Sequence, residues 1–232
     1  MKRLISITIL FLFSLLSKGQ YYRSSYSNVG LQVIQPIDSL KYFIGDTFFG
    51  INAGTNLPIF NSLIEIGFDY SWARLEQEDR EFVINNYQSI TGQYIYENAT
   101  MILQNRNNRY ITNLRFKPFK GNFQPYFDIN CGFESYRILA DVIKEGYGYS
   151  YASNSNFQYY DITYVTGWSA GLRISSNEKL FVDFKFQTLK SGPVNYVKFD
   201  TFTIIDDENI FYEKTEIEPK KFVYQVGLSY TY

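Results

Sequence analysis

The feature of this sequence that most constrains its fold is a strict alternation of apolar and polar residues. The segment "IEIGFDYSW" places an Ile, Phe, Tyr or Trp at every second position from Ile64 to Trp72. Residues Phe222 to Tyr232 alternate in the same way. Successive side chains of a β-strand point to opposite faces, so a period of two predicts strands with one apolar and one polar face. Helical periodicity is absent, and we therefore expect an all-β protein.

The alternation recurs along the chain, and the links between the alternating segments differ in length. We predict eight strands, at 28–37, 44–56, 62–74, 106–118, 123–139, 159–175, 178–190 and 220–232. Long links at 38–43, 75–105, 140–158 and 191–219 alternate with short ones. Short turns at one rim and long loops at the other are typical of an outer-membrane barrel, whose tilted strands need about nine to eleven residues each. Residues 75–105 keep some alternation, which predicts either extended flanking strands or an extra hairpin and ten strands.

The two faces of these strands differ in charge. The apolar face of the alternating segments carries no Asp, Glu, Lys or Arg. The charges lie on the opposite face, at Glu65, Asp69, Arg115, Lys117, Asp128, Glu134, Asp161, Arg173, Asp183 and Lys185. A soluble barrel has the reverse arrangement, with apolar residues inside. We therefore predict a transmembrane antiparallel up-and-down barrel in which these residues form a lumen charge network.

The N-terminus indicates export. A positive segment, Met1 to Arg3, precedes an apolar run, Leu4 to Leu16, which is too short to span a bilayer. Small residues then predict cleavage after Gly19, which gives a signal peptide at 1–19 and a barrel domain at 20–232. The single cysteine, Cys131, has no internal disulfide partner and is expected to act as a small hydrophobic residue.

The last strand resembles the C-terminal signal by which bacterial outer-membrane barrels are recognised by their assembly machinery. The pattern is a polar residue, a glycine and two aromatic or apolar residues, matched by Gln225, Gly227, Tyr230 and Tyr232. With "FGINAGTN" from Phe49 and "QPYFDINCGF" from Gln124, the chain resembles small eight-stranded outer-membrane barrels of the OmpX and OmpA type. It is similar, more narrowly, to the PorT-like barrels of Bacteroidota. This resemblance implies a Gram-negative cell envelope.

Composition excludes several functions. The net charge of −1 gives no basic surface for nucleic acid. The chain has no histidine, so Ser–His–Asp and Cys–His mechanisms and His-containing metal sites are excluded. Lumen carboxylates are open to two interpretations, as acid–base pairs or as partners of buried Arg and Lys. The lumen-facing glycines likewise predict either a cavity or space for large neighbours such as Tyr126, Tyr136 and Arg115.

We therefore expect a monomeric, non-enzymatic protein of the cell outer membrane, with no cofactor. Its long loops would serve surface binding or envelope integrity, and 140–158, rich in Tyr, Ser, Gly and Asn, suits protein or glycan contacts. Expected partners are outer-membrane lipid and lipopolysaccharide and the barrel assembly machinery. The PorT-like resemblance implies an alternative, an accessory component of a secretion or gliding machinery, whose partners would be the other subunits of that complex.

Overall fold

The structure is a computed structural model that describes residues 25–45, 47–60, 63–88, 93–119, 121–146, 149–152, 157–176, 179–204 and 210–232. The predicted signal peptide and its cleavage site lie outside the described residues.

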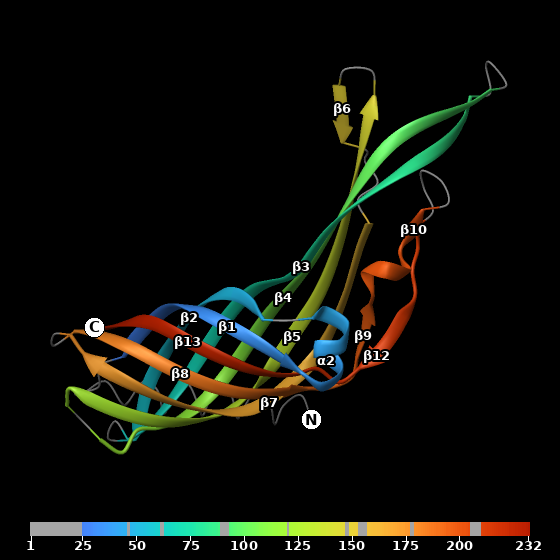
Figure 1. Ribbon diagram of the computed structural model, residues 1–232. Coiled ribbons are helices and arrows are strands. Elements are labelled where there is room, and N and C mark those ends of the chain that lie inside the picture. The colour runs from blue at the N-terminus through green and yellow to red at the C-terminus, as the bar shows by residue number, and fades with distance from the viewer. Residues whose placement is uncertain are drawn as a thin grey trace, which may run out of the picture.

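Eight long antiparallel strands form a closed barrel (Figure 1). They are β1 (Tyr26–Ile37), β2 (Phe48–Phe60), β3 (Ile64–Gln88), β4 (Gln93–Phe116), β5 (Phe123–Gly146), β7 (Phe157–Ser175), β8 (Leu180–Ser191) and β13 (Lys220–Thr231). Each pairs with its neighbour along the chain, and β1 pairs with β13 to close the ring. The prediction of eight transmembrane strands is confirmed.

The ten-strand alternative is wrong, because the described residues of this link, 75–88 and 93–105, belong to β3 and β4 and contain no additional barrel strand. Strands β3 and β4 instead continue past the ring as one long hairpin, paired from Ile64↔Phe116 to Gln88↔Gln93 with a register shift between Arg74 and Glu76. Figure 1 shows this hairpin rising beside the upper part of β5. A short strand, β6 (Tyr149–Ala152), pairs with the end of β5. We call this side of the barrel the long-loop end and the opposite side the short-turn end.

The long-loop end contains a helix that we did not predict, α2 (Asp38–Ile44). It occupies the expected link 38–43 and the first residue of the expected strand 44–56, so β2 begins later, at Phe48. Its buried residues, Leu40 and Ile44, are four positions apart and therefore lie on one helix face. A single pair at this spacing is too short a periodic signal to be recognised in sequence. No described helix is long and apolar enough to cross a membrane.

The connection between β8 and β13 folds into a cap over the long-loop end. It contains β9 (Val194–Val197), the 3₁₀-helix η1 (Phe199–Thr201), β10 (Thr203–Ile204), β11 (Ile210–Phe211) and β12 (Lys214–Ile217). Strand β9 pairs with β12, and β10 pairs with β11. Val197, Phe199 and Phe202 of the cap pack against apolar residues of the raised β4–β5 sheet, such as Met101 and Ile138. The cap therefore has its own hydrophobic core beyond the barrel.

The outer face of the barrel is an apolar belt. Large hydrophobic side chains are exposed on every barrel strand, among them Leu31, Phe49, Phe68, Leu114, Ile129, Trp168, Phe184 and Val226. Buried polar and charged residues alternate with them and face the lumen, including Gln32, Asp69, Arg115, Asp128, Ser169 and Asp183. A continuous apolar exterior around a charged interior is unfavourable in water and matches a lipid bilayer.

The apolar belt makes a quantitative prediction. An arginine in place of Ile129, which is 60% exposed near the middle of the belt, should reduce the free energy of unfolding by about 2–4 kcal/mol. Urea titration of the barrel in phospholipid vesicles would measure this. The control is Val83→Arg, because Val83 is 58% exposed on the raised β3–β4 hairpin. Equal costs at the two positions would contradict a lipid-facing belt.

Candidate functional site

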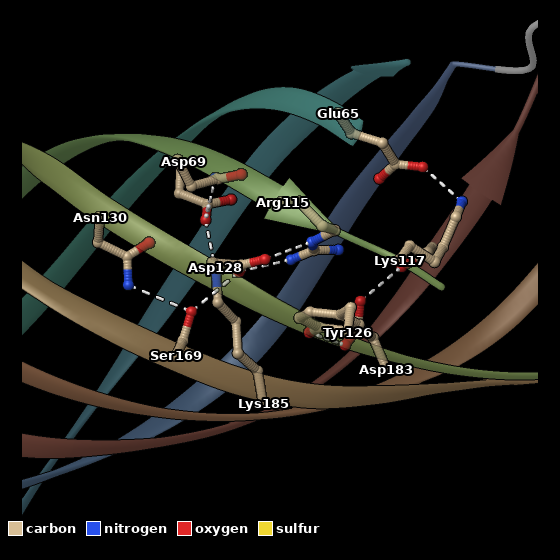
Figure 2. Close-up of polar contacts among 12 residues, drawn as sticks. Glu65, Asp69, Arg115, Lys117, Tyr126, Asp128, Asn130, Ser169, Asp183 and Lys185 are labelled. Carbon is tan, nitrogen blue, oxygen red and sulfur yellow. Dashed lines mark hydrogen bonds and ion pairs between the residues drawn. The ribbon is translucent and has the colours of Figure 1, made fainter. Parts of the chain in front are cut away.

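The centre of the lumen network is the pair formed by Arg115 and Asp128, which face each other across β4 and β5 (Figure 2). Nε and Nη2 of Arg115 donate to the two carboxylate oxygens of Asp128 at 2.7 and 2.9 Å. The Ser169 hydroxyl donates to the same carboxylate at 2.9 Å. The ammonium of Lys185 lies 2.8 Å from Asp69 and 3.4 Å from Asp128, so it links two carboxylates. These groups are buried and neutralise one another.

A second part of the network lies closer to the short-turn end. Lys117 forms an ion pair with Glu65, which also accepts a hydrogen bond from the Tyr26 hydroxyl at 2.9 Å. The Tyr126 hydroxyl donates to Asp183 at 2.6 Å (Figure 2). Side chains from β1, β3, β5 and β8 meet here, together with Lys117, which directly follows β4. The network therefore connects strands that are distant in the ring and fills the space between them.

A separate polar group surrounds Glu134. Its carboxylate forms an ion pair with Lys221 and accepts hydrogen bonds from the hydroxyls of Ser191 and Tyr136, the latter at 2.8 Å. All four side chains are buried. This group joins β5 to β8 and β13 on the long-loop side of the Arg115–Asp128 pair.

The structure places nine of the ten predicted network residues in the barrel interior, and Asp161 apart from them. Arg173 is buried there against aromatic rings: its guanidinium lies 3.6 Å from the ring centre of Tyr26 and 4.4 Å from that of Phe181. Asp161 is half-buried at the long-loop rim, where it accepts a hydrogen bond from the backbone N–H of Asn195 at 2.8 Å. Asp161 lies on the inward-facing side of β7. The pairing of β7 with β8 begins only at Val165, so Asp161 lies beyond the closed ring, and its carboxylate binds the cap instead.

Three interior residues were missed in the sequence. Tyr26 precedes the expected first strand. Arg109 and Lys221 lie inside the expected strands 106–118 and 220–232, but each comes one residue before the clearly alternating part of its strand, which begins at Tyr110 and at Phe222. Arg109 is buried and donates to Gln32 at 2.8 Å and to Ser71 at 3.1 Å. Both basic residues are an even number of positions away from the lumen-facing residues of their strands, so they point to the same face. Extending each alternating segment by one residue would have found them.

The lumen glycines provide space for large side chains. A Cβ at Gly171 would lie 2.2 Å from the Tyr126 ring, and one at Gly54 would lie 2.0 Å from Asp69. Toward the long-loop end, inward-facing apolar residues of the barrel meet Leu40 and Ile44 of α2 and residues of β9 and β12 in one hydrophobic cluster. In the part of the chain that the structure describes, these glycines therefore accommodate large neighbouring side chains, and apolar residues occupy the interior toward the long-loop end.

The lumen carboxylates are engaged as ion-pair and hydrogen-bond partners. Asp69, Asp128 and Glu134 each lie within 4 Å of a lysine or arginine nitrogen. Among the described residues, no group of three His, Cys, Asp or Glu side chains has the arrangement of a metal site. This geometry supports the interpretation of the carboxylates as partners of buried cations.

One carboxyl group beside the cap, that of Glu76, has a raised pKa. Glu76 lies beyond the apolar belt, on the face of β3 that the cap covers. Burial raises the pKa of Glu76 to about 7, and the neighbouring carboxylates of Glu78 and Asp200 add to the shift, while Arg80 opposes it. Burial also raises the pKa of Tyr196, a cap residue whose hydroxyl is hydrogen-bonded to Asn105.

Solved outer-membrane barrels show a distant similarity to this chain. Neisserial surface protein A is 8% identical, with a TM-score of 0.48, over 90% of this chain and 97% of that one. Ail of Yersinia pestis, in complex with the heparin analogue sucrose octasulfate, is 11% identical, with a TM-score of 0.48, over 90% and 99%. A major outer membrane protein of Thermus thermophilus is 10% identical, with a TM-score of 0.48, over 90% and 99%. No protein-family model matches the sequence, and no curated protein matches it.

Removing one partner of the central ion pair should destabilise the barrel. Asp128→Asn leaves the buried charge of Arg115 without its counter-ion, which costs about 3–5 kcal/mol. Urea unfolding in phospholipid vesicles measures the change. The matched variant Asp141→Asn alters an exposed carboxylate and should change stability by less than about 0.5 kcal/mol. Equal unfolding midpoints for the two variants would contradict the assigned role of Asp128.

The stability of the cap should depend on the protonation of Glu76. Its pKa is higher in the folded state, about 7, than its ordinary value of 4.5. The folded state therefore binds the proton more tightly, and stability falls as pH rises from about 4.5 to about 7. Hydrogen-exchange protection of the Tyr196 amide should be greater at pH 5 than at pH 8. Glu76→Gln should abolish this difference, and a difference that persists in Glu76→Gln would contradict the assignment.

Proposed function

We propose that this chain is an integral outer-membrane barrel that presents its raised β3–β4–β5 sheet and its cap at the cell surface for binding. The observation that carries this proposal is the apolar belt around a charged interior. Such a barrel is suited to residence in lipid, and a ring of only eight strands, whose interior is about wide enough for side chains, argues against a diffusion channel. The raised sheet, α2 and the cap all lie at the long-loop end, whereas short turns connect the strands at the other end.

The proposal assigns no catalysis to the protein. The chain contains no histidine, and the interior carboxylates are engaged with cations and hydroxyls. The long-loop end instead offers protein surface: Tyr42, Val83 and Phe211 are exposed large hydrophobic residues beyond the ring. Exposed aromatic and apolar groups on a rigid support are suited to contacts with another macromolecule.

The C-terminal residues support recognition by the barrel assembly machinery. Tyr230 and Tyr232 are exposed on the outer face of β13, and Gln225 and Gly227 face the lumen. The two aromatic side chains of the signal are therefore accessible on one face of the last strand. Export by a signal peptide rests on the N-terminal sequence pattern, and an origin in Bacteroidota rests on the sequence resemblance; both are part of this proposal.

An accessory role in a secretion or gliding machinery, as in PorT-like proteins, is the alternative. It rests on the sequence resemblance to that group. The size of the native species, extracted from its own membrane in mild detergent, separates the two. A lone barrel would favour surface presentation, while comigration with a large complex would favour the accessory role.

Membrane topology provides the direct test of the proposed function. In a Cys131→Ser background, a cysteine replaces Val83 on the raised hairpin in one variant and Ser176 near the short-turn rim in another. A membrane-impermeant maleimide should label the first in intact cells and the second only after the outer membrane is permeabilised. Labelling in the reverse order, or of neither cysteine, would refute surface presentation of the long-loop end.

A further inference from the structure

Three arginines lie side by side on the outer face of the barrel. In the strand register, Arg74 of β3 is opposite Arg106 of β4, and Arg106 is opposite Arg137 of β5. Each follows the outward-facing register of its strand, alternating with buried residues such as Ala73 and Tyr136. Tyr160 of β7 continues the row and is 61% exposed. We call Arg74, Arg106 and Arg137 the arginine row.

The arginine row marks the upper boundary of the apolar belt. On each of the three strands, its arginine is the first charged residue on the outer face between the short-turn end and the long-loop end. Tyr70 and Tyr110 lie below it on the same face, with ring centres 5.1 Å apart. Above it come Gln77 on β3, Gln104 on β4 and Leu139 on β5, and then the raised sheet. Interfacial aromatic residues next to cationic ones are typical of the level at which lipid headgroups meet a barrel.

Within the part of the chain that the structure describes, the arginine row has no carboxylate counter-ion. Arg74 donates to Gln77 at 3.1 Å and Arg106 donates to Gln104 at 2.7 Å, both neutral amides. The Nε atoms of Arg106 and Arg137 have no hydrogen-bond partner. Within the described residues, no carboxylate forms an ion pair with any of the three. Like charges directly opposite each other destabilise a sheet, so this arrangement calls for an external anion.

Another pair of basic residues on the same rim shows the contrast. Lys190 of β8 and Lys220 of β13 are also directly opposite each other on the outer face. Each has a carboxylate partner, Glu218 at 3.0 Å for Lys190 and Asp38 at 2.9 Å for Lys220. Among the described residues, adjacent cations therefore have acidic partners on one side of the rim and have none at the arginine row.

We propose that the arginine row binds the headgroup of an outer-leaflet lipid that carries at least two phosphate groups. Guanidinium groups present planar pairs of N–H donors that match phosphate oxygens. Adjacent strands are about 4.8 Å apart, so three arginines extend over about 10 Å, enough for more than one phosphate. The raised sheet above the row flanks the headgroup, and the apolar belt below it contacts the acyl chains. This inference rests on the proposed outer-membrane location.

The test compares two double variants of the purified barrel in uncharged detergent. Arg106→Gln with Arg137→Gln removes two adjacent cations from the row, and Lys190→Gln with Lys220→Gln removes two adjacent cations that have acidic partners. The probes are lipid A with two phosphates, lipid A with one phosphate, and phosphatidylglycerol, with bound lipid measured by native mass spectrometry. We expect the arginine variant to bind the two-phosphate lipid at least about tenfold more weakly than the wild type and the lysine variant within about twofold of it.

Two results would overturn the proposal. One is an equal affinity of the two double variants for the two-phosphate lipid, with heat-modifiable gel migration showing that both are assembled. The other needs no variant: a wild-type barrel without preference for two phosphates over one would exclude recognition by the row. Failure of either kind leaves the topology result unaffected, so the lipid site and surface presentation are tested separately.

Discussion

The pairing of β1 with β13 is the interaction on which the rest of the structure depends. It extends in register from Tyr26↔Thr231 to Ile37↔Lys220 and joins the two ends of the described chain. Without it, the sheet would have two edges with unpaired backbone N–H and C=O groups. Lipid offers no partner for such groups, so an apolar outer face is tolerable only if the ring is closed. Closure also determines which side chains share the interior.

A closed ring of eight strands leaves space for side chains and little else, and the interior chemistry follows from that. The Arg115–Asp128 pair joins the neighbouring strands β4 and β5. Lys185, with Asp69, and the Glu134 group, with Lys221, connect strands that are not adjacent in the ring. Large aromatic side chains fit because glycines such as Gly171 face them. Ion pairs occupy one part of the interior, and the hydrophobic cluster with α2 occupies the part toward the long-loop end. The barrel is therefore a rigid support for what lies above it.

The same strands serve two environments along their length. Within the ring, the outer face of β3, β4 and β5 is apolar, and beyond the arginine row it carries polar and charged residues. The inner face changes too, from the charged lumen to the apolar surface on which Val197, Phe199 and Phe202 pack. The register shift between Arg74 and Glu76 lies at this transition. The place where the strands pass out of the apolar belt is therefore also the place where the residue types on both faces of the sheet change.

The sequence by itself determined the all-β class and which face of each strand is apolar, and it predicted eight strands with ten left open. These follow from local alternation, which depends only on the pleat of a strand. It also placed Asp128, Arg115 and Lys185 on the interior face. Tertiary structure decided their pairing: Lys185 reaches Asp69 across 116 positions of sequence, which no local pattern encodes. It likewise formed α2 and the cap, because their apolar residues find partners only after the barrel has closed. The arginine row was hidden for the same reason, since three residues far apart in the chain become neighbours only in the register of the sheet.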